Sequence, residues 1–192
     1  MNYIHIVAHD ENCAIGQQGK LPWNCPLDLK WFKHFTEGKN LVVGRKTYDD
    51  LVRRHQKKSM DRVSPLPGRK LYVISGNLEF TPYSDVVICR DQEHLESMFE
   101  SHETLIVIGG SGIYKMFKPN LILATEVPFK AECPDAYYPP HFDEMVKSDI
   151  HWLSTSKEDI EIHVYVDRSS EHIYHDSIAS IQKFQESLRC AF

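Results

Sequence analysis

Short apolar runs rich in β-branched residues alternate along this chain with segments of helical periodicity. Runs of this kind between turn residues predict strands. Several are nearly continuous in apolar residues, which is typical of strands covered on both faces. The run 160–166 instead alternates with a period of two, which favours an antiparallel edge strand. The predicted strands are residues 3–9, 40–44, 70–75, 85–89, 104–110, 121–127 and 160–166.

Three helices are predicted between these strands. The first runs from Pro26 to about Phe35, with proline in its first turn and Gly38 as its stop signal. The second covers 91–101, with Asp91 as its cap, and the third begins near Ser111. This alternation predicts an α/β fold with a central, twisted, mostly parallel sheet, an antiparallel C-terminal edge strand and flanking helices.

Two regions look like additions to this layered domain. Residues 53–64 are polar and mostly charged, which predicts a solvated loop. Residues 169–192 follow the last strand and carry a helical pattern of Ile178, Ile181 and Leu188. This extension either packs back on the domain of residues 1–168 or offers a docking face to another subunit or protein.

Composition narrows the class of protein. A length of 192 residues suggests one domain, and a net charge of -5 excludes a strongly basic nucleic-acid surface. No apolar run has the length of a membrane span, and the N-terminus lacks the features of a signal peptide. The five cysteines are scattered without a CxxC pair, so we expect reduced thiols and a cytoplasmic protein. The histidines of HIYH (172–175) lack a carboxylate or cysteine at ligand spacing, so no metal site is expected.

One carboxylate stands on an apolar stripe. Asp28 precedes Phe32 by four residues and Phe35 by seven, so a helix would place all three on one face. An acid in the first turn is favoured by the helix macrodipole, which gives a purely structural reason for it. A functional reason would be a ligand pocket on that apolar side.

Three strand ends carry residues suited to phosphate. VIGGSGIY (107–114) runs from a strand through glycines into a helix, where a backbone can approach a ligand closely. VVGRKTYDDL (42–51) places two cations and a threonine at a similar junction, and KLYVISG (70–76) ends in Ser-Gly. Each alone also fits a plain turn or solvated charges. Together they predict a ligand across the carboxyl edge of the sheet.

The motifs in their order resemble the dihydrofolate reductase family. They are AIG-x2-GKLPWN-x-P-x-DLKWFK, VVGRKTY, LPGRKLYVIS, VIGGSGIY and DAYYP, and they extend from residue 1 to about 168. The resemblance implies the three-layer fold of that family and transfer of hydride from NADPH to carbon 6 of dihydrofolate, with a proton taken up at nitrogen 5. It also implies a role in tetrahydrofolate synthesis and one-carbon metabolism, binding of folate-like inhibitors, and a monomer unless the tail mediates association.

The resemblance also assigns residues one by one. Asp28 matches the helix carboxylate that faces the pterin, and water near Trp23 and Leu21 would deliver the proton. Arg69 matches the arginine that pairs with the substrate's α-carboxylate, and Thr125 supports Asp28. The implied substrate contacts are Ile6, Val7, Ala8, Asp28, Leu29, Phe32, Leu51, Arg69, Ile108 and Thr125.

For the cofactor, the resemblance implies a mobile loop, a glycine turn and a phosphate site. Gly109 and Gly110 match an unusual cis peptide, and Arg45, Lys46 and Ser75 match the site for the adenosine 2′-phosphate. The implied NADPH contacts are Ala8, Ile15, Gly16, Leu21, Gly44, Arg45, Lys46, Thr47, Ser75, Gly76, Ile108, Gly109, Gly110, Ser111, Gly112, Ile113 and Tyr114.

The chain departs from the family pattern at a few positions. Gly76 stands where a second hydroxyl residue is common, which weakens the expected preference for NADPH. Ser111 replaces a frequent glycine, Tyr138 a common phenylalanine, and the segment 53–64 lies just before Arg69. Two other functions stay open, a pyrimidine reductase of the same fold and a structural or assembly protein that binds folate and NADPH without turnover.

Overall fold

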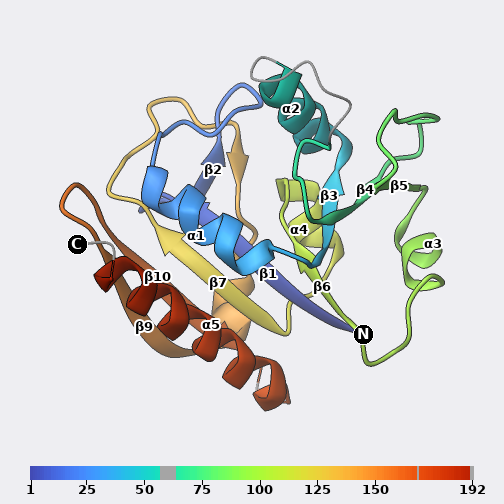
Figure 1. The fold of residues 1–192 in the computed structure, drawn as a ribbon. Coiled ribbons are helices and arrows are strands. Elements are labelled where there is room, and N and C mark those ends of the chain that lie inside the picture. The colour runs from blue at the N-terminus through green and yellow to red at the C-terminus, as the bar shows by residue number, and fades with distance from the viewer. Residues whose placement is uncertain (57–63, 168, 191–192) are drawn as a thin grey trace.

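The structure, a computed structural model, describes residues 1–56, 64–167 and 169–190. Its centre is an eight-stranded sheet in the order β5-β4-β3-β6-β1-β7-β10-β9 (Figure 1). The strands of this sheet are β1 (Asn2–His9), β3 (Asn40–Gly44), β4 (Lys70–Ile74), β5 (Val86–Cys89), β6 (Thr104–Val107), β7 (Leu121–Glu126), β9 (Val146–Ser154) and β10 (Asp159–Val166). Two short strands, β2 (Ala14–Gly16) and β8 (Ala136–Tyr137), pair separately.

The sheet is parallel over most of its width. Strand β1 pairs in parallel with β6 and β7, and β3 does so with β4 and β6. Strand β10 pairs antiparallel with β7, as expected, but also with β9 on its other side. The prediction that 160–166 forms the edge was therefore wrong, because β9 is the edge strand. Strand β9 escaped prediction because its side chains are mostly polar and only Leu153 among them is buried.

Helices cover both faces of the sheet. The helices are α1 (Pro26–Thr36), α2 (Arg45–Gln56), α3 (Gln92–Glu96), α4 (Ser111–Met116) and α5 (Glu171–Arg189), with the 3₁₀ helix η1 (Pro140–Glu144). One core cluster joins Ile4 and Ile6 of β1 to residues of α1, α2 and α5. A second joins Tyr3 and Val7, on the opposite face of β1, to residues of α3 and α4. The predicted three-layer α/β fold is confirmed.

The helix ends agree with the sequence signals in part. Helix α1 begins at Pro26, and Gly38 beyond its end has a positive φ of 73°. Asp91 caps α3, since its side chain accepts from the backbone N–H of His94 at 2.8 Å. The helix predicted over 91–101 was too long, because α3 ends at Glu96.

The charged segment 53–64 is not wholly a loop. Its first four residues form the last turn of α2, so the prediction was wrong there. Residues 57–63 lie outside the described part of the chain, and Ser64 is buried. The helical turn places Arg53 and Arg54 beside Asp50 of the same helix.

The tail forms helix α5, which packs against the rest of the domain. Its Ile173, Ile181 and Phe184 are buried in the same core cluster as α1, and Ile178 and Leu188 pack at the margin of that cluster. This agrees with the packing-back interpretation; the division into residues 1–168 and an extension stays a prediction. Among the described residues, no helix combines the length and apolarity needed to cross a membrane.

Candidate active site

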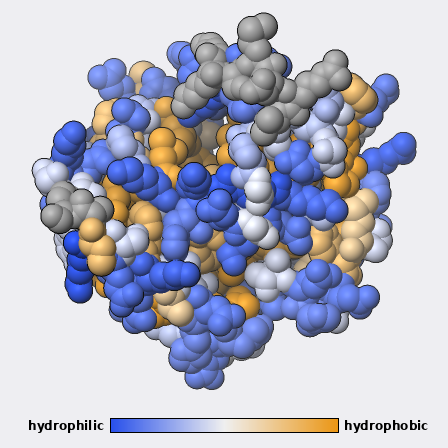
Figure 2. Space-filling model, in the orientation of Figure 1, coloured by the Kyte–Doolittle hydropathy of each residue, from blue (hydrophilic) through white to orange (hydrophobic). Residues whose placement is uncertain are grey.

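A cavity of about 200 Å³ lies between α1, α2 and the carboxyl ends of β1 and β6. Figure 2 shows apolar side chains around the hollow between α1 and α2. The fold brings most of the predicted substrate residues together here. Those that line the cavity are Ile6, Val7, Ala8, Asp28, Leu29, Phe32, Leu51 and Ile108.

Asp28 supplies the carboxylate of this cavity. It lies in the first turn of α1 and is only 8% exposed. Burial raises the pKa of Asp28 to about 6, because the charged form loses its hydration. Thr125 opposes that rise and the negative charge of Glu158 adds to it. The side chain is thus a buried acid that titrates near neutral pH, which is a common property of functional carboxyls.

Two buried polar atoms of the predicted site lack a partner among the described residues. They are Thr125 Oγ1 and Trp23 Nε1. Thr125 lies near Asp28, but its approach falls short of a full hydrogen bond. Buried polar groups are nearly always satisfied by protein, water or ligand. These two atoms therefore fit a site that receives a polar ligand or ordered water.

A second cavity of about 270 Å³ adjoins the first. Ile15, Leu21, Thr47 and Gly110 line both cavities, so the two are continuous along one cleft. Gly16 and Lys46 line the second cavity only, as members of the predicted cofactor set. An elongated ligand can therefore extend from the apolar floor at Asp28 toward the glycine turn.

The glycine turn has the backbone that the motif predicted. The peptide bond between Gly109 and Gly110 is cis, and Gly109 has a φ of 103°. A Cβ at Gly109 would lie 2.9 Å from Tyr114 Cε2, and one at Gly44 would lie 2.7 Å from Ile113 Cγ1. Both positions therefore require glycine for β3 and α4 to approach the turn.

Tyr114 links the turn to the first strand. Its hydroxyl donates to the carbonyl oxygen of Ile6 at 2.7 Å, and its ring lines the first cavity. Burial raises the pKa of Tyr114, so the phenol keeps its proton and the hydrogen bond. This bond holds α4 against β1 at the boundary between the two cavities.

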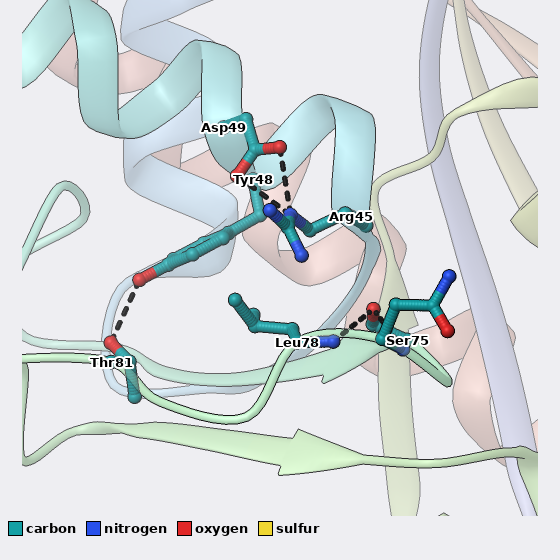
Figure 3. A network of polar contacts seen from close by, with 7 residues as sticks. Arg45, Tyr48, Asp49, Ser75, Leu78 and Thr81 are labelled. Atoms are coloured by element: carbon teal, nitrogen blue, oxygen red, sulfur yellow. Dashed lines mark hydrogen bonds and ion pairs between the residues drawn. The ribbon is translucent and has the colours of Figure 1, made fainter.

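Arg45 and Ser75, two of the three predicted phosphate residues, lie outside both cavities. Arg45 Nε donates to both carboxylate oxygens of Asp49, at 2.8 and 3.0 Å (Figure 3). Ser75 Oγ accepts from the backbone N–H of Leu78 at 3.0 Å (Figure 3), which leaves its own hydroxyl hydrogen free to donate. The guanidinium keeps its Nη donors, and the arrangement can accept an anion.

Arg69 is buried and does not line the cavity. Its Nε donates to Thr36 Oγ1 at 3.2 Å, and its two Nη atoms donate to the carbonyl oxygens of Pro67 at 2.8 Å and Lys33 at 3.2 Å. A guanidinium has five N–H donors, so one remains on each Nη atom. These bonds fix the side chain while leaving a pair of donors suited to a carboxylate.

Sequence reasoning missed two charged residues that line the first cavity. Asp50 lines both cavities, and Arg54 lines the first one beside Leu51. Arg54 Nε lies 2.6 Å from Asp50 Oδ2. Their four-residue spacing indicates an ion pair on a helix. The prediction of a loop over 53–64 left no helix on which this spacing could be recognised.

Several predicted residues line neither cavity. They are Trp23, Gly44, Arg45, Arg69, Ser75, Gly76, Gly109, Ser111, Gly112, Ile113 and Thr125. Among the residues that the structure describes, no cluster of three or more histidine, cysteine or acidic side chains could hold a metal ion.

The comparisons with known proteins point to one family. The family model described as dihydrofolate reductase matches residues 2–166. The dihydrofolate reductase of Buchnera aphidicola subsp. Acyrthosiphon pisum is 32% identical over 143 residues, covering 73% of this chain and 81% of that protein. That of Haemophilus influenzae is 29% identical over 160 residues, covering 78% and 91%.

A solved structure has the same fold. Dihydrofolate reductase from Enterococcus faecalis, complexed with NADP(H) and RAB-propyl, aligns with a TM-score of 0.72 at 24% identity, over 87% of this chain and 96% of that one. The family match spans every strand of the main sheet, the helix with Asp28 and the cis glycine turn. By sequence, this chain belongs to the dihydrofolate reductase family.

Proposed function

We propose that this chain reduces 7,8-dihydrofolate to 5,6,7,8-tetrahydrofolate with NADPH. The observation that carries the proposal is Asp28, a buried carboxyl in an apolar cavity that continues into a second cavity beside a cis glycine turn. This activity is that of the family. The roles of the individual residues follow from their positions.

Asp28 orients the pterin and supports its protonation. Its carboxylate is the natural partner of the amidine edge of a pterin, because a charged acceptor and paired N–H donors form strong hydrogen bonds. A pKa of about 6 keeps part of the population protonated near neutral pH. Water beside Trp23 and Leu21 delivers the proton to nitrogen 5, while Asp28 holds the ring and tunes its basicity.

Apolar side chains hold the substrate in position. Leu29 and Phe32 of α1 face Leu51 of α2 across the cavity, which suits a flat pterin and an aminobenzoyl ring. The two spare donors of Arg69 pair with the α-carboxylate of the tail. Lysine could not copy this contact, since it lacks the planar fork.

Part of the proposed cofactor set lines the second cavity, and the rest lies at the strand ends and the glycine turn. When bound, NADPH supplies the hydride for carbon 6. Ile15, Gly16 and Leu21 close over the nicotinamide side, and the 109–114 turn meets the pyrophosphate. Arg45, Lys46 and Ser75 hold the 2′-phosphate, so NADPH is preferred to NADH. Closeness and orientation of the two ligands are what the protein contributes to the rate.

We also propose a cellular location and an oligomeric state. The free thiols of the described structure suit a reducing cytoplasm, and we propose a monomer that binds dihydrofolate and folate-like inhibitors. A second candidate, a folate- and NADPH-binding assembly protein, is favoured only by the tail helix α5. A pyrimidine reductase of the same fold would have no use for Asp28 and Arg69 together.

The test is turnover by the purified full chain. NADPH oxidation is followed by the loss of near-ultraviolet absorbance, with and without dihydrofolate. Oxidation that requires dihydrofolate supports the proposal. Binding of both ligands without oxidation would replace it by the binding-protein function, and oxidation only with a pyrimidine substrate would replace it by the other reductase.

A further inference from the structure

The helix that carries Asp28 has no cap of its own. Its N-cap residue, Cys25, makes no side-chain capping hydrogen bond, and Pro26 has no N–H to donate. The first free donor is the backbone N–H of Leu27, which donates to Glu158 Oε2 at 2.8 Å. An acceptor from the β9–β10 hairpin thus completes the helix start that the local sequence leaves open.

The hairpin is built to hold Glu158 in place. Residues 155–158 connect β9 to β10, and the N–H of Thr155 donates to the carbonyl oxygen of Glu158 at 2.8 Å. In return, the N–H of Glu158 donates to Thr155 Oγ1 at 3.0 Å. These two bonds close the turn at its ends and fix the backbone from which the carboxylate reaches α1.

Glu158 therefore places a negative charge at the start of α1. Its donor, Leu27, is the residue directly before Asp28. The macrodipole stabilises an anion at this end of a helix. Two carboxylates near one helix start also repel, so the charge on Glu158 disfavours the charged form of Asp28. Lys30 and Lys157 line the same hollow as Glu158.

The other groups around Asp28 are few. From the sheet, the Thr125 hydroxyl approaches the carboxyl, and from α4 the Tyr114 phenol faces it. The thiol of Cys25, just before the helix, experiences both carboxylates, which raise its pKa together with burial. Arg54 and Asp50 of α2 line the same cavity as Asp28 and form an ion pair with each other. Among these charged groups, Glu158 is the one whose charge raises the pKa of Asp28.

We infer that Glu158 is a positioning residue for the proposed reaction: its carboxylate, held by the turn at Thr155, accepts from Leu27 and fixes the first turn of α1, from which Asp28 projects. The inference rests on the proposed function for its consequence in turnover. Its physical core, the coupling between Glu158 and Asp28, exists in the protein without ligands and can be measured there.

The test uses two substitutions in the full chain. Glu158→Gln keeps an oxygen that can accept from Leu27 but removes the charge, whereas Glu158→Ala removes both. The Asp28 carboxyl is titrated by ¹³C NMR in the free protein, and the pH dependence of kcat/KM for dihydrofolate is measured in parallel. We expect the Asp28 midpoint to move to lower pH in both variants, because a neighbouring negative charge is removed. Only Glu158→Ala should also raise the KM for dihydrofolate, by about threefold to tenfold, because the helix start loosens.

A matched control is Glu171→Gln. It removes the same charge from the exposed first turn of α5. That turn is about 25 Å along the helix from Leu188, the residue of α5 that lines the hollow beside Glu158, so the removed charge is far from Asp28. Its Asp28 midpoint should equal that of the unmodified protein. An unchanged or raised midpoint in Glu158→Gln overturns the inference, whatever the turnover. Absence of turnover in the unmodified protein would instead overturn the proposed function and leave the carboxyl titration as the test of Glu158.

Discussion

Phe184 on α5 lies with its ring centroid 5.7 Å from that of Trp31 on α1. The same ring is 5.0 Å from His34, whose Nε2 donates to the carbonyl oxygen of Ser180 at 3.2 Å. Trp31 is completely buried and follows Asp28 by three residues on the same helix. The C-terminal helix therefore supports the helix from which the candidate catalytic carboxyl projects.

Phe184→Ala is expected to weaken both stability and substrate binding. Loss of a buried aromatic ring should lower the free energy of unfolding by about 3–5 kcal/mol, as a cavity forms beside Trp31. The KM for dihydrofolate should rise more than that for NADPH, because α1 contributes to the substrate cavity. Chemical denaturation and steady-state kinetics measure the two effects. Gln182→Ala, at an exposed position of α5, should change neither; equal rises in both KM values would contradict the support of α1.

Asp28→Asn is expected to remove most turnover while leaving NADPH binding intact. The amide cannot accept a proton or form a charged pair with the pterin, so kcat/KM for dihydrofolate should fall about 10²-fold to 10⁴-fold at neutral pH. NADPH affinity, measured by fluorescence titration, serves as the internal control. A rate close to that of the unmodified protein would remove Asp28 from its proposed role.

The same substitution should stabilise the protein at high pH. Burial raises the pKa of Asp28 from 3.8 to about 6, so the native state binds a proton that the unfolded chain releases between these values. The free energy of unfolding therefore falls as the pH rises through this window. Asp28→Asn should gain about 1–3 kcal/mol over the unmodified protein at pH values well above the window, and much less below it. Chemical denaturation at pH values below and above this window measures the difference. A gain independent of pH would show that burial does not destabilise the charged form of Asp28.

Arg45→Ala is expected to separate the two nicotinamide cofactors. Loss of charge-assisted bonds to the 2′-phosphate should weaken NADPH binding about 10-fold to 100-fold and change NADH binding little. Asp49→Asn is the companion variant, because it frees Arg45 from its ion pair and should strengthen NADPH binding. Equilibrium titrations with both cofactors provide the comparison. Equal losses for NADPH and NADH in Arg45→Ala would place the phosphate site elsewhere.

Local patterns in the chain were sufficient for much of the fold. The continuous apolar runs identified the buried parallel strands, because burial on both faces leaves no room for polar alternation. The carboxylate at Asp28 stood out for a related reason, since a helical period placed it among aromatic rings. The glycine motifs at 44 and 109 also stood out, and in the structure the side chains of Ile113 and Tyr114 lie where a Cβ at these positions would be.

Tertiary contacts decided the rest. Strand β9 is mostly polar and has Leu153 as its only buried residue, and it forms the sheet edge through its pairing with β10. The pairings of Leu27 with Glu158 and Trp31 with Phe184 join positions more than 100 residues apart, and no local signal indicates them. The residue spacing in α1 thus indicated an acid on an apolar face. The cap of the helix came from the β9–β10 hairpin, its support came from α5, and the raised pKa of the acid came chiefly from burial in the folded protein.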